Sequence, residues 1–223
     1  MDEELKKSIL KTGTSILGIV CTDGVVLAAD RQVTAGTIVV DKNFNKIIHI
    51  NDRLLAAITG GVSDAQFLMR IVTAELKLKE LKSRQQSTIK ESASLIAYLT
   101  FRNIRAPSMI PSIVGSLVAG VDPDGTARLF TIEPAGAVFE VENYDANFSS
   151  GMPYILGVLE RGYKKDINVK QGVELAKECL KASIQRDVGS GYGIDIYTLT
   201  KEGIKKAVSQ DITSTFVESQ NRR

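Results

Sequence analysis

The first sixty residues contain several short apolar, β-rich runs that are separated by polar turn residues. Two β-rich runs, residues 15–21 and 25–30, flank Thr22-Asp23-Gly24. Asp-Gly between two apolar runs is a strong signal for a β-hairpin. Two further strands are predicted at residues 46–50 and 54–59. The chain therefore begins with antiparallel strands joined by tight turns.

A helical period follows at two places along the chain. The first pair of helices is predicted at residues 64–84, with Ser63 as N-cap, and from Thr88 to the region bounded by Pro107 and Pro111. Thr88 and Glu91 have the spacing of a capping box. The second pair is predicted at residues 153–163 and at residues 168–186, where Asn168 is the expected N-cap.

Strand signals separate the two helix pairs and follow the second one. These strands are predicted at residues 113–121, 128–132, 137–141, 146–148, 194–200 and 204–208. Tight turns imply antiparallel sheets, and grouped helices imply segregated layers, so we expect an α+β fold, a four-layer αββα sandwich with two antiparallel sheets flanked by helix pairs. No linker or repeat is visible. Residues 14–223 are therefore predicted to form one domain with a loose C-terminal tail.

Composition places the chain among ordinary globular proteins, with 43% hydrophobic and 24% charged residues. The formal net charge of +2 and the lack of Trp give no basic stripe or base-stacking surface, so neither nucleic acid nor a membrane is an expected partner. The first thirteen residues carry acids as well as lysines around a short apolar core, unlike a secretory signal. We therefore expect a cytoplasmic protein.

A single histidine restricts the possible chemistry. His49 lies in an alternating apolar stretch and is interpreted as a strand histidine turned outward. Cys21 and Cys179 form no CxxC pair, so no zinc site is expected from this chain, and neither a metal nor another cofactor is predicted. Ser-His-Asp and Cys-His schemes would both need His49. If the chain is a hydrolase, its base is expected not to be histidine.

Six short motifs occur in order along the chain. They are Gly-Thr at 13–14, GIVCTDGVVLAAD at 18–30, the lysine at 46, TGGVSDAQF at 59–67, SSGMP with GVLE between 150 and 160, and QRDVGSG at 185–191. Each is weak alone, whereas six at compatible spacing are specific. Through them, residues 13–203 resemble the β-type subunits of the proteasome, and the intact set looks more archaeal than eukaryotic.

The resemblance implies hydrolysis without histidine. Residues 1–13 would be a propeptide, cut between Gly13 and Thr14. The Thr14 hydroxyl would be the nucleophile, and its new α-amine, with a pKa of about 8, would be the general base. The chain would then be a threonine endopeptidase that acts on unfolded proteins.

The resemblance assigns supporting roles to residues that would otherwise have ordinary interpretations. Lys46 corresponds to the catalytic lysine and Asp30 to its paired acid, although an isolated pair of this kind is usually structural. Ser150, Asp187 and Ser190 correspond to the set that orients the amine of the threonine. Without the resemblance, Ser150 would be a loop serine and Asp187 an acid at a helix end.

Substrate contacts are also implied by the resemblance. Gly60 would supply an oxyanion-hole N–H, and Thr34 would hold the substrate backbone. The pocket for the residue before the cut would be lined by Val33, Ile48, Ile58 and Val62. An uncharged, branched lining predicts cleavage after large hydrophobic residues. A phosphate loop at 189–193 is a weaker interpretation, because no Lys-Ser/Thr follows it.

Three positions depart from the family pattern: Ile16 in a start that is usually Thr-Thr-Thr, Gln32 where a basic residue is common, and Met152 in place of a small residue. Two alternatives to an active subunit therefore stay open. One is a structural β-type ring subunit that retains its propeptide. The other is a non-catalytic α-type subunit, which is disfavoured because only thirteen residues precede the first strand.

The resemblance also implies the partners. β-type subunits form seven-membered rings, stacked in a core particle with rings of α-type subunits. Other β-type subunits and α-type subunits are thus the expected partners, while a regulatory ATPase would be contacted only indirectly. The sequence leaves open whether a second β-type subunit shares the ring.

Overall fold

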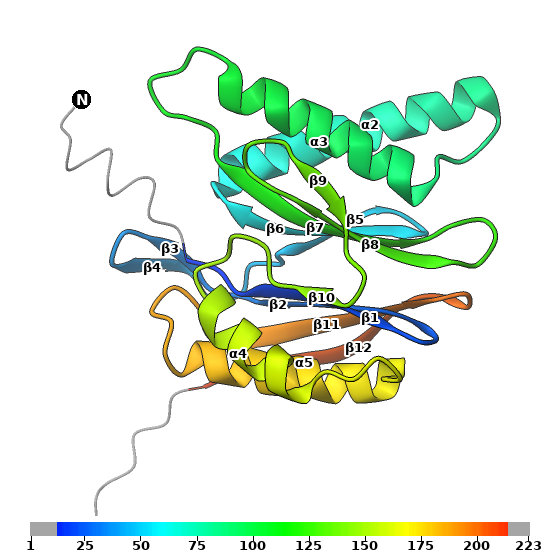
Figure 1. Ribbon diagram of the computed structural model, residues 1–223. Coiled ribbons are helices and arrows are strands. Elements are labelled where there is room, and N and C mark those ends of the chain that lie inside the picture. Colours follow the sequence, from blue (N-terminus) through cyan, green and yellow to red (C-terminus); the bar gives the residue numbers. More distant parts are fainter. Residues whose placement is uncertain (1–12, 214–223) are drawn as a thin grey trace, which may run out of the picture.

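The computed structural model describes residues 13–213, and these form four stacked layers (Figure 1). Two five-stranded sheets lie face to face, and a pair of helices covers the outer face of each. Every strand pairing is antiparallel among the described residues. The predicted α+β fold, an αββα sandwich, is therefore confirmed.

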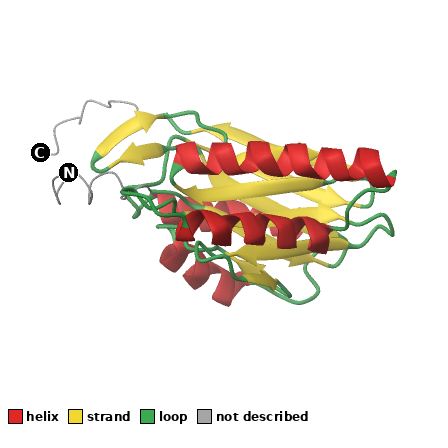
Figure 2. Ribbon diagram, turned by 90° about the horizontal axis from the view of Figure 1, so that it is seen from above, coloured by secondary structure: helices red, strands yellow, loops and turns green. Residues whose placement is uncertain are grey.

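The first sheet has the strand order β5-β6-β7-β8-β9. Its strands are β5 Ile47–Asn51, β6 Leu54–Gly60, β7 Val114–Val121, β8 Ala127–Ile132 and β9 Val138–Glu140. The helices α2 (Val62–Ser83) and α3 (Ile89–Arg105) lie side by side over it (Figure 2).

The second sheet has the order β10-β1-β2-β11-β12. Its strands are β1 Ile16–Cys21, β2 Gly24–Asp30, β10 Tyr144–Asp145, β11 Gly193–Thr200 and β12 Gly203–Asp211. It is covered by α4 (Met152–Gly162) and α5 (Val169–Ile184). A separate two-stranded hairpin, β3 (Val33–Ala35) and β4 (Ile38–Asp41), extends from the end where the described chain begins (Figure 1).

Three apolar clusters fill the three spaces between the four layers. Strand β2 shows why its sequence is continuously apolar. Val25 and Leu27 face the other sheet, while Val26 and Ala28 face α5. Both faces of a central strand are buried here, so the period-2 pattern of a half-exposed strand is lost. None of the described helices is long and apolar enough to cross a membrane.

Several local predictions are confirmed. Thr22 and Asp23 form a two-residue turn between β1 and β2, with Cys21 opposite Gly24. Thr88 and Asn168 each cap a helix through a complete capping box. These signals succeed because the hydrogen bonds concerned link residues only three positions apart.

The start of α2 was predicted wrongly. Gly61 is the N-cap and Ser63 lies inside the helix, with no side-chain cap bond. Gly60, at φ 96°, turns the chain sharply out of β6, so the helix begins at Val62. A Cβ at Gly60 would lie 2.0 Å from the Ile113 carbonyl oxygen, so this turn requires glycine.

Two strand predictions also need correction. The strand expected at residues 146–148 is instead β10 at Tyr144–Asp145. Asn147 has a left-handed φ of 47°, which ends any extended run. The β3–β4 hairpin was not predicted, because Ile38 and Val40 are largely exposed and form no clear alternating pattern.

Candidate active site

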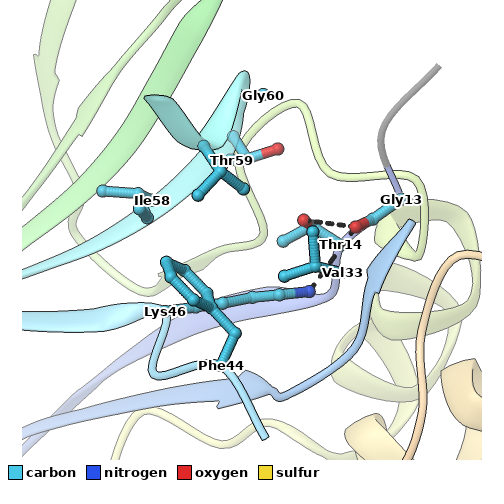
Figure 3. A pocket seen from close by; sticks show the side chains of 9 residues that line it. Gly13, Thr14, Val33, Phe44, Lys46, Ile58, Thr59 and Gly60 are labelled. Carbon is cyan, nitrogen blue, oxygen red and sulfur yellow. Dashed lines mark hydrogen bonds between the residues drawn. The ribbon is translucent and has the colours of Figure 1, made fainter. Parts of the chain in front are cut away.

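Strand ends from both sheets meet at Thr14 (Figure 3). Thr14 precedes β1 and Asp30 ends β2, while Lys46 precedes β5 and Gly60 ends β6 of the other sheet. Thr14, Asp30 and Lys46 are 5%, 1% and 3% exposed. The sandwich therefore brings together groups that lie far apart in the sequence, in a site largely closed to solvent.

Lys46 and Asp30 form a buried ion pair, with Lys46 Nζ 2.6 Å from Asp30 Oδ1. Burial raises the pKa of the Asp30 carboxyl and lowers the pKa of Lys46, while their mutual attraction opposes both shifts. The backbone N–H groups of Ser15, Gln32 and Gly191 also donate to Asp30, at 2.8, 3.0 and 3.0 Å. The carboxylate is thus fully hydrogen-bonded, which holds the lysine in one place.

The Gly13–Thr14 bond lies against this pair. Thr14 Oγ1 donates to the Gly13 carbonyl oxygen at 2.6 Å, and Lys46 Nζ lies 3.5 Å from the same oxygen (Figure 3). Gly13 N–H donates to Thr34 Oγ1 at 2.8 Å. Two donors on one carbonyl oxygen withdraw electron density from its carbon, next to the hydroxyl of the following residue.

A second group of side chains, from Ser150, Asp187 and Ser190, surrounds the backbone nitrogen of Thr14. This nitrogen donates to Ser150 Oγ at 2.9 Å, and Ser150 Oγ lies 2.6 Å from Asp187 Oδ2. Ser190 Oγ donates to the same carboxylate oxygen, also at 2.6 Å. Ser150 precedes α4, and the other two residues follow α5. The loops that flank the second helix pair therefore supply the groups around the Thr14 nitrogen.

An apolar pocket opens beside Thr14. It is lined by Gly13, Thr14, Val33, Phe44, Lys46, Ile58, Thr59, Gly60 and Val62. The structure thus brings three of the four predicted pocket residues to Thr14. Ile48 is the exception, because it packs against the cluster under α2 and α3. Thr34 lines the adjoining cleft, which continues past Gly60 to Ile110.

Phe44 is a pocket residue that the sequence prediction missed. It is an isolated apolar residue in the polar run Asp41-Lys42-Asn43-Phe44-Asn45, two positions before Lys46. Its backbone N–H donates to the Arg31 carbonyl, which fixes the loop. One feature of the sequence could have identified Phe44 as a pocket residue: it is a lone aromatic residue in a polar loop, close to the proposed catalytic lysine.

Two of the residues that depart from the family pattern, and the single histidine, make defined contacts in the structure. Gln32 donates from its side-chain amide to the Val188 carbonyl at 2.7 Å and so supports the loop of Asp187. Met152 packs on the cluster under α4 and α5. His49 is exposed on β5, with its ring edge-on to Tyr197 at 5.3 Å, and does not line the pocket of Thr14.

No group of three His, Cys, Asp or Glu side chains is arranged to hold a metal ion between residues 13 and 213. Burial raises the pKa of both Cys21 and Cys179 to about 12. Neither thiol is therefore a candidate nucleophile near neutral pH.

Comparison with known proteins agrees with this architecture. The family model described as Proteasome subunit matches residues 10–199. A proteasome subunit beta of Nanoarchaeum equitans is 42% identical over 193 residues, which cover 86% of this chain and 96% of that protein. One of Methanocaldococcus fervens is 36% identical over 206 residues, covering 92% and 90%.

A third relative, the proteasome subunit beta of Methanosphaera stadtmanae, is 37% identical over 200 residues, covering 90% of this chain and 93% of the relative. The chain belongs to the proteasome subunit family, and within it to the β-type subunits of the core. The resemblance stated from the six motifs is thereby confirmed.

Proposed function

We propose that this chain is an active threonine endopeptidase subunit of a proteasome core, made as a precursor that loses residues 1–13. One observation carries the proposal. The Thr14 hydroxyl lies 2.6 Å from the carbonyl oxygen of the bond to be cut, and the buried Lys46 reaches the same oxygen. The buried, fully hydrogen-bonded pair of Lys46 and Asp30 beside that bond also supports a catalytic role.

Maturation would proceed in two steps. The Thr14 oxygen attacks the Gly13 carbonyl carbon, the C–N bond to Thr14 breaks, and the hydroxyl proton passes to the departing nitrogen. This leaves an ester between Gly13 and the Thr14 oxygen, together with a free α-amine. Water then hydrolyses the ester, releasing residues 1–13 with a new carboxylate and restoring the hydroxyl.

Peptide cleavage would use the amine made in this way. The α-amine accepts the proton of the Thr14 hydroxyl, directly or through a water molecule, as the hydroxyl attacks the substrate carbonyl. The positive charge of Lys46 favours loss of that proton. The backbone N–H of Gly60 would stabilise the oxyanion, while Ser150, Asp187 and Ser190 orient the amine.

The apolar pocket supports a preference for apolar residues before the cut. Val33, Phe44, Ile58 and Val62 offer no partner for a substrate carboxylate, and an unpaired buried carboxylate is costly. We propose cleavage mainly after large hydrophobic residues. A peptide panel cut preferentially after Asp or Arg would contradict this.

Membership in the family places the chain in a proteasome core together with α- and β-type subunits. We further propose that it joins seven-membered rings whose sites face an enclosed chamber for unfolded proteins, with any regulatory ATPase contacted only indirectly. Enclosure would protect folded proteins from a protease of broad specificity. Location in the cytoplasm stays a prediction.

Co-expression with an α-type partner tests the proposal. Wild-type chain in the assembled particle should begin at Thr14 by N-terminal sequencing and cleave a fluorogenic peptide. Thr14→Ala should keep residues 1–13 and lose at least about 10³-fold in activity, since nucleophile and base both disappear. Thr126→Ala, in an exposed turn, is the matched control and should behave as wild type.

A structural ring subunit is the second candidate, favoured by the departures at Ile16, Gln32 and Met152. The intact mass of the assembled wild-type chain separates the two. Retention of residues 1–13 in an assembled, inactive particle would establish the structural role and contradict the proposed enzyme.

A further inference from the structure

A buried line of hydroxyl groups leads away from the site into α5. Ser15 Oγ lies 2.7 Å from Ser190 Oγ and 2.5 Å from Ser183 Oγ. Ser15 and Ser183 have no exposed surface, and Ser190 is 5% exposed. Ser183 was not among the residues that the sequence singled out, and it lies on a helix rather than in a loop.

The carboxylate of Asp187, at one end of this line, determines which hydroxyl donates and which accepts in each hydrogen bond. The Asp187 carboxylate only accepts hydrogen bonds, so Ser190 donates its single hydroxyl proton to Oδ2. Ser190 must then accept from Ser15, whose proton is thereby used. Ser15 in turn must accept from Ser183. The order of donation is Ser183 to Ser15 to Ser190 to Asp187.

The same carboxylate oxygen also accepts a hydrogen bond from Ser150, the residue that holds the Thr14 nitrogen. Ser150 Oγ is 2.6 Å from Asp187 Oδ2 but 3.0 Å from the Thr14 carbonyl oxygen, so the shorter contact to the carboxylate takes its proton. The Ser150 oxygen is then free to accept from the Thr14 nitrogen at 2.9 Å. The geometry of this acceptor depends on where Asp187 Oδ2 is held.

The loop at Gly151 packs tightly against this line of hydroxyl groups. A Cβ at Gly151 would lie 2.0 Å from Ser15 Oγ and 2.1 Å from Ser183 Oγ. Gly151 N–H meanwhile donates to the Thr14 carbonyl at 3.1 Å. Glycine at this position lets the loop that carries Ser150 lie directly on the hydroxyl line, where Ser15 and Ser183 have no exposed surface.

We propose that Ser183 is a positioning residue, the first donor of a buried hydroxyl relay that holds Asp187, and through it Ser150, in place around the Thr14 nitrogen. This inference rests on the proposed function. Hydrogen bonds in a chain polarise one another, so the first donor strengthens those that follow. Loss of the Ser183 hydroxyl would weaken the bond from Ser190 and leave more negative charge on Asp187.

The consequence for catalysis has a definite sign. More negative charge near the α-amine stabilises its protonated form, so the acid limb of the activity profile moves to higher pH. We expect Ser183→Ala to lower kcat about fivefold, far less than loss of a general base, and to raise the midpoint of the acid limb by ~0.3 pH units. KM should not change, because Ser183 does not touch the substrate pocket.

The test uses particles assembled with the α-type partner, and compares Ser183→Ala, Ser15→Ala and the double variant. Ser183→Ala should add less than about twofold to the loss in the Ser15→Ala background, because the relay is already broken there. Ser92→Ala is the matched control. Ser92 is a buried helix serine on α3, 2% exposed, whose hydroxyl donates to Thr88 O, and its loss should leave kcat and the pH profile unchanged.

Each result of this test supports or contradicts the relay. Wild-type kcat and pH profile in Ser183→Ala, or an equal loss with and without Ser15, would overturn the relay. If Ser183→Ala does not assemble, Ser183→Cys replaces it: a weak donor of similar shape should give an intermediate kcat, and a wild-type value would overturn the inference. A wild-type particle without activity and without a free Thr14 amine would refute the proposed function, and the relay with it.

Discussion

At the scale of single residues, this site depends on how closely backbone and side chains approach one another. Gly13 and Gly189 touch through their backbones, so the Gly13–Thr14 bond lies directly against the loop that carries Asp187. Phe44 forms part of the pocket wall, although the sequence prediction did not include it. Both contacts leave little tolerance for added or removed volume.

Gly13→Ala should therefore slow removal of residues 1–13. A Cβ at residue 13 would lie 2.0 Å from Gly189 Cα, and backbone cannot move aside as a flexible side chain can. We expect at least a ~10-fold lower rate of processing, because small misplacement of reacting groups is costly. Intact mass of particles sampled over time measures the rate.

Gly157→Ala is the control for that variant, since nothing lies within 4 Å of a Cβ at this position in α4. It should be processed at the wild-type rate. Wild-type processing of Gly13→Ala would show that the loop at Gly189 yields easily, and would contradict the tight fit.

Phe44→Ala should change substrate preference. The enclosed space of the pocket is about 10 Å³, roughly enough for one water molecule. A large substrate side chain therefore needs the lining to move, and we expect the ring of Phe44, the one aromatic residue of the lining, to limit the space. Removing the ring should raise kcat/KM for Phe over Ala before the cut by ~10-fold, a modest change for an apolar pocket. A fluorogenic peptide pair measures this ratio.

Phe139→Ala, at a largely exposed position on β9, serves as the control for Phe44→Ala. It should leave the ratio unchanged. An unchanged ratio in Phe44→Ala as well would show that Phe44 does not limit the pocket.

At the scale of elements, a charged cluster ties the strands that end near the site. Arg31, next to the end of β2, makes two bonds of 2.9 Å to Asp195 on β11. It also bonds to Asp211 and Ser209 on β12. Because Arg31 immediately follows Asp30, this cluster fixes the position of the acid that holds Lys46.

Asp195→Asn should destabilise the purified chain by about 3 kcal/mol at pH 7, since it leaves the buried Arg31 without its main partner. Burial acts to raise the pKa of Asp195, but bonds from Arg31, Lys206 and Ser209 lower it overall. The stabilisation is thus present above the unfolded pKa of about 4 and lost as pH falls through the folded value. Denaturant unfolding at pH 7 and pH 3 should show the difference shrinking.

The matched control is Asp166→Asn, at an exposed position before α5. It should change stability by less than about 0.5 kcal/mol at either pH. An equal loss for Asp195→Asn at both pH values would show that shape, not charge, accounts for its effect.

At the scale of the whole molecule, the described chain leaves large apolar side chains exposed. Phe67 and Leu81 on α2, Met109 after α3 and Val188 beside the site are between 60% and 84% exposed. Such residues are expected where subunits of an assembly meet. The site loops around Val188 are supported in the single chain mainly by hydrogen bonds.

We therefore expect the chain purified alone to be mostly unprocessed and weakly active, and to gain both processing and activity on addition of an α-type partner. Size-exclusion chromatography with intact mass and a peptide assay on each fraction measures this. Full processing of the isolated monomer would contradict the dependence on assembly.

The sequence by itself determined the features that depend on near neighbours. The Thr22-Asp23 turn, the capping box at Thr88, the N-cap at Asn168 and most of the helices and longer strands follow from contacts a few residues apart. The six motifs identified the family and named Thr14, Asp30, Lys46, Ser150, Asp187 and Ser190, which the structure brings together.

Only the tertiary structure decided which groups meet across the two sheets. It put Phe44 in the pocket and Ile48 outside it, began α2 at Val62, pressed Gly13 against Gly189, and joined Ser183 to Ser15. These contacts link residues up to 176 positions apart along the chain. Local patterns carry no record of such pairings, because strand pairing and layer packing fix them only when the whole chain has folded.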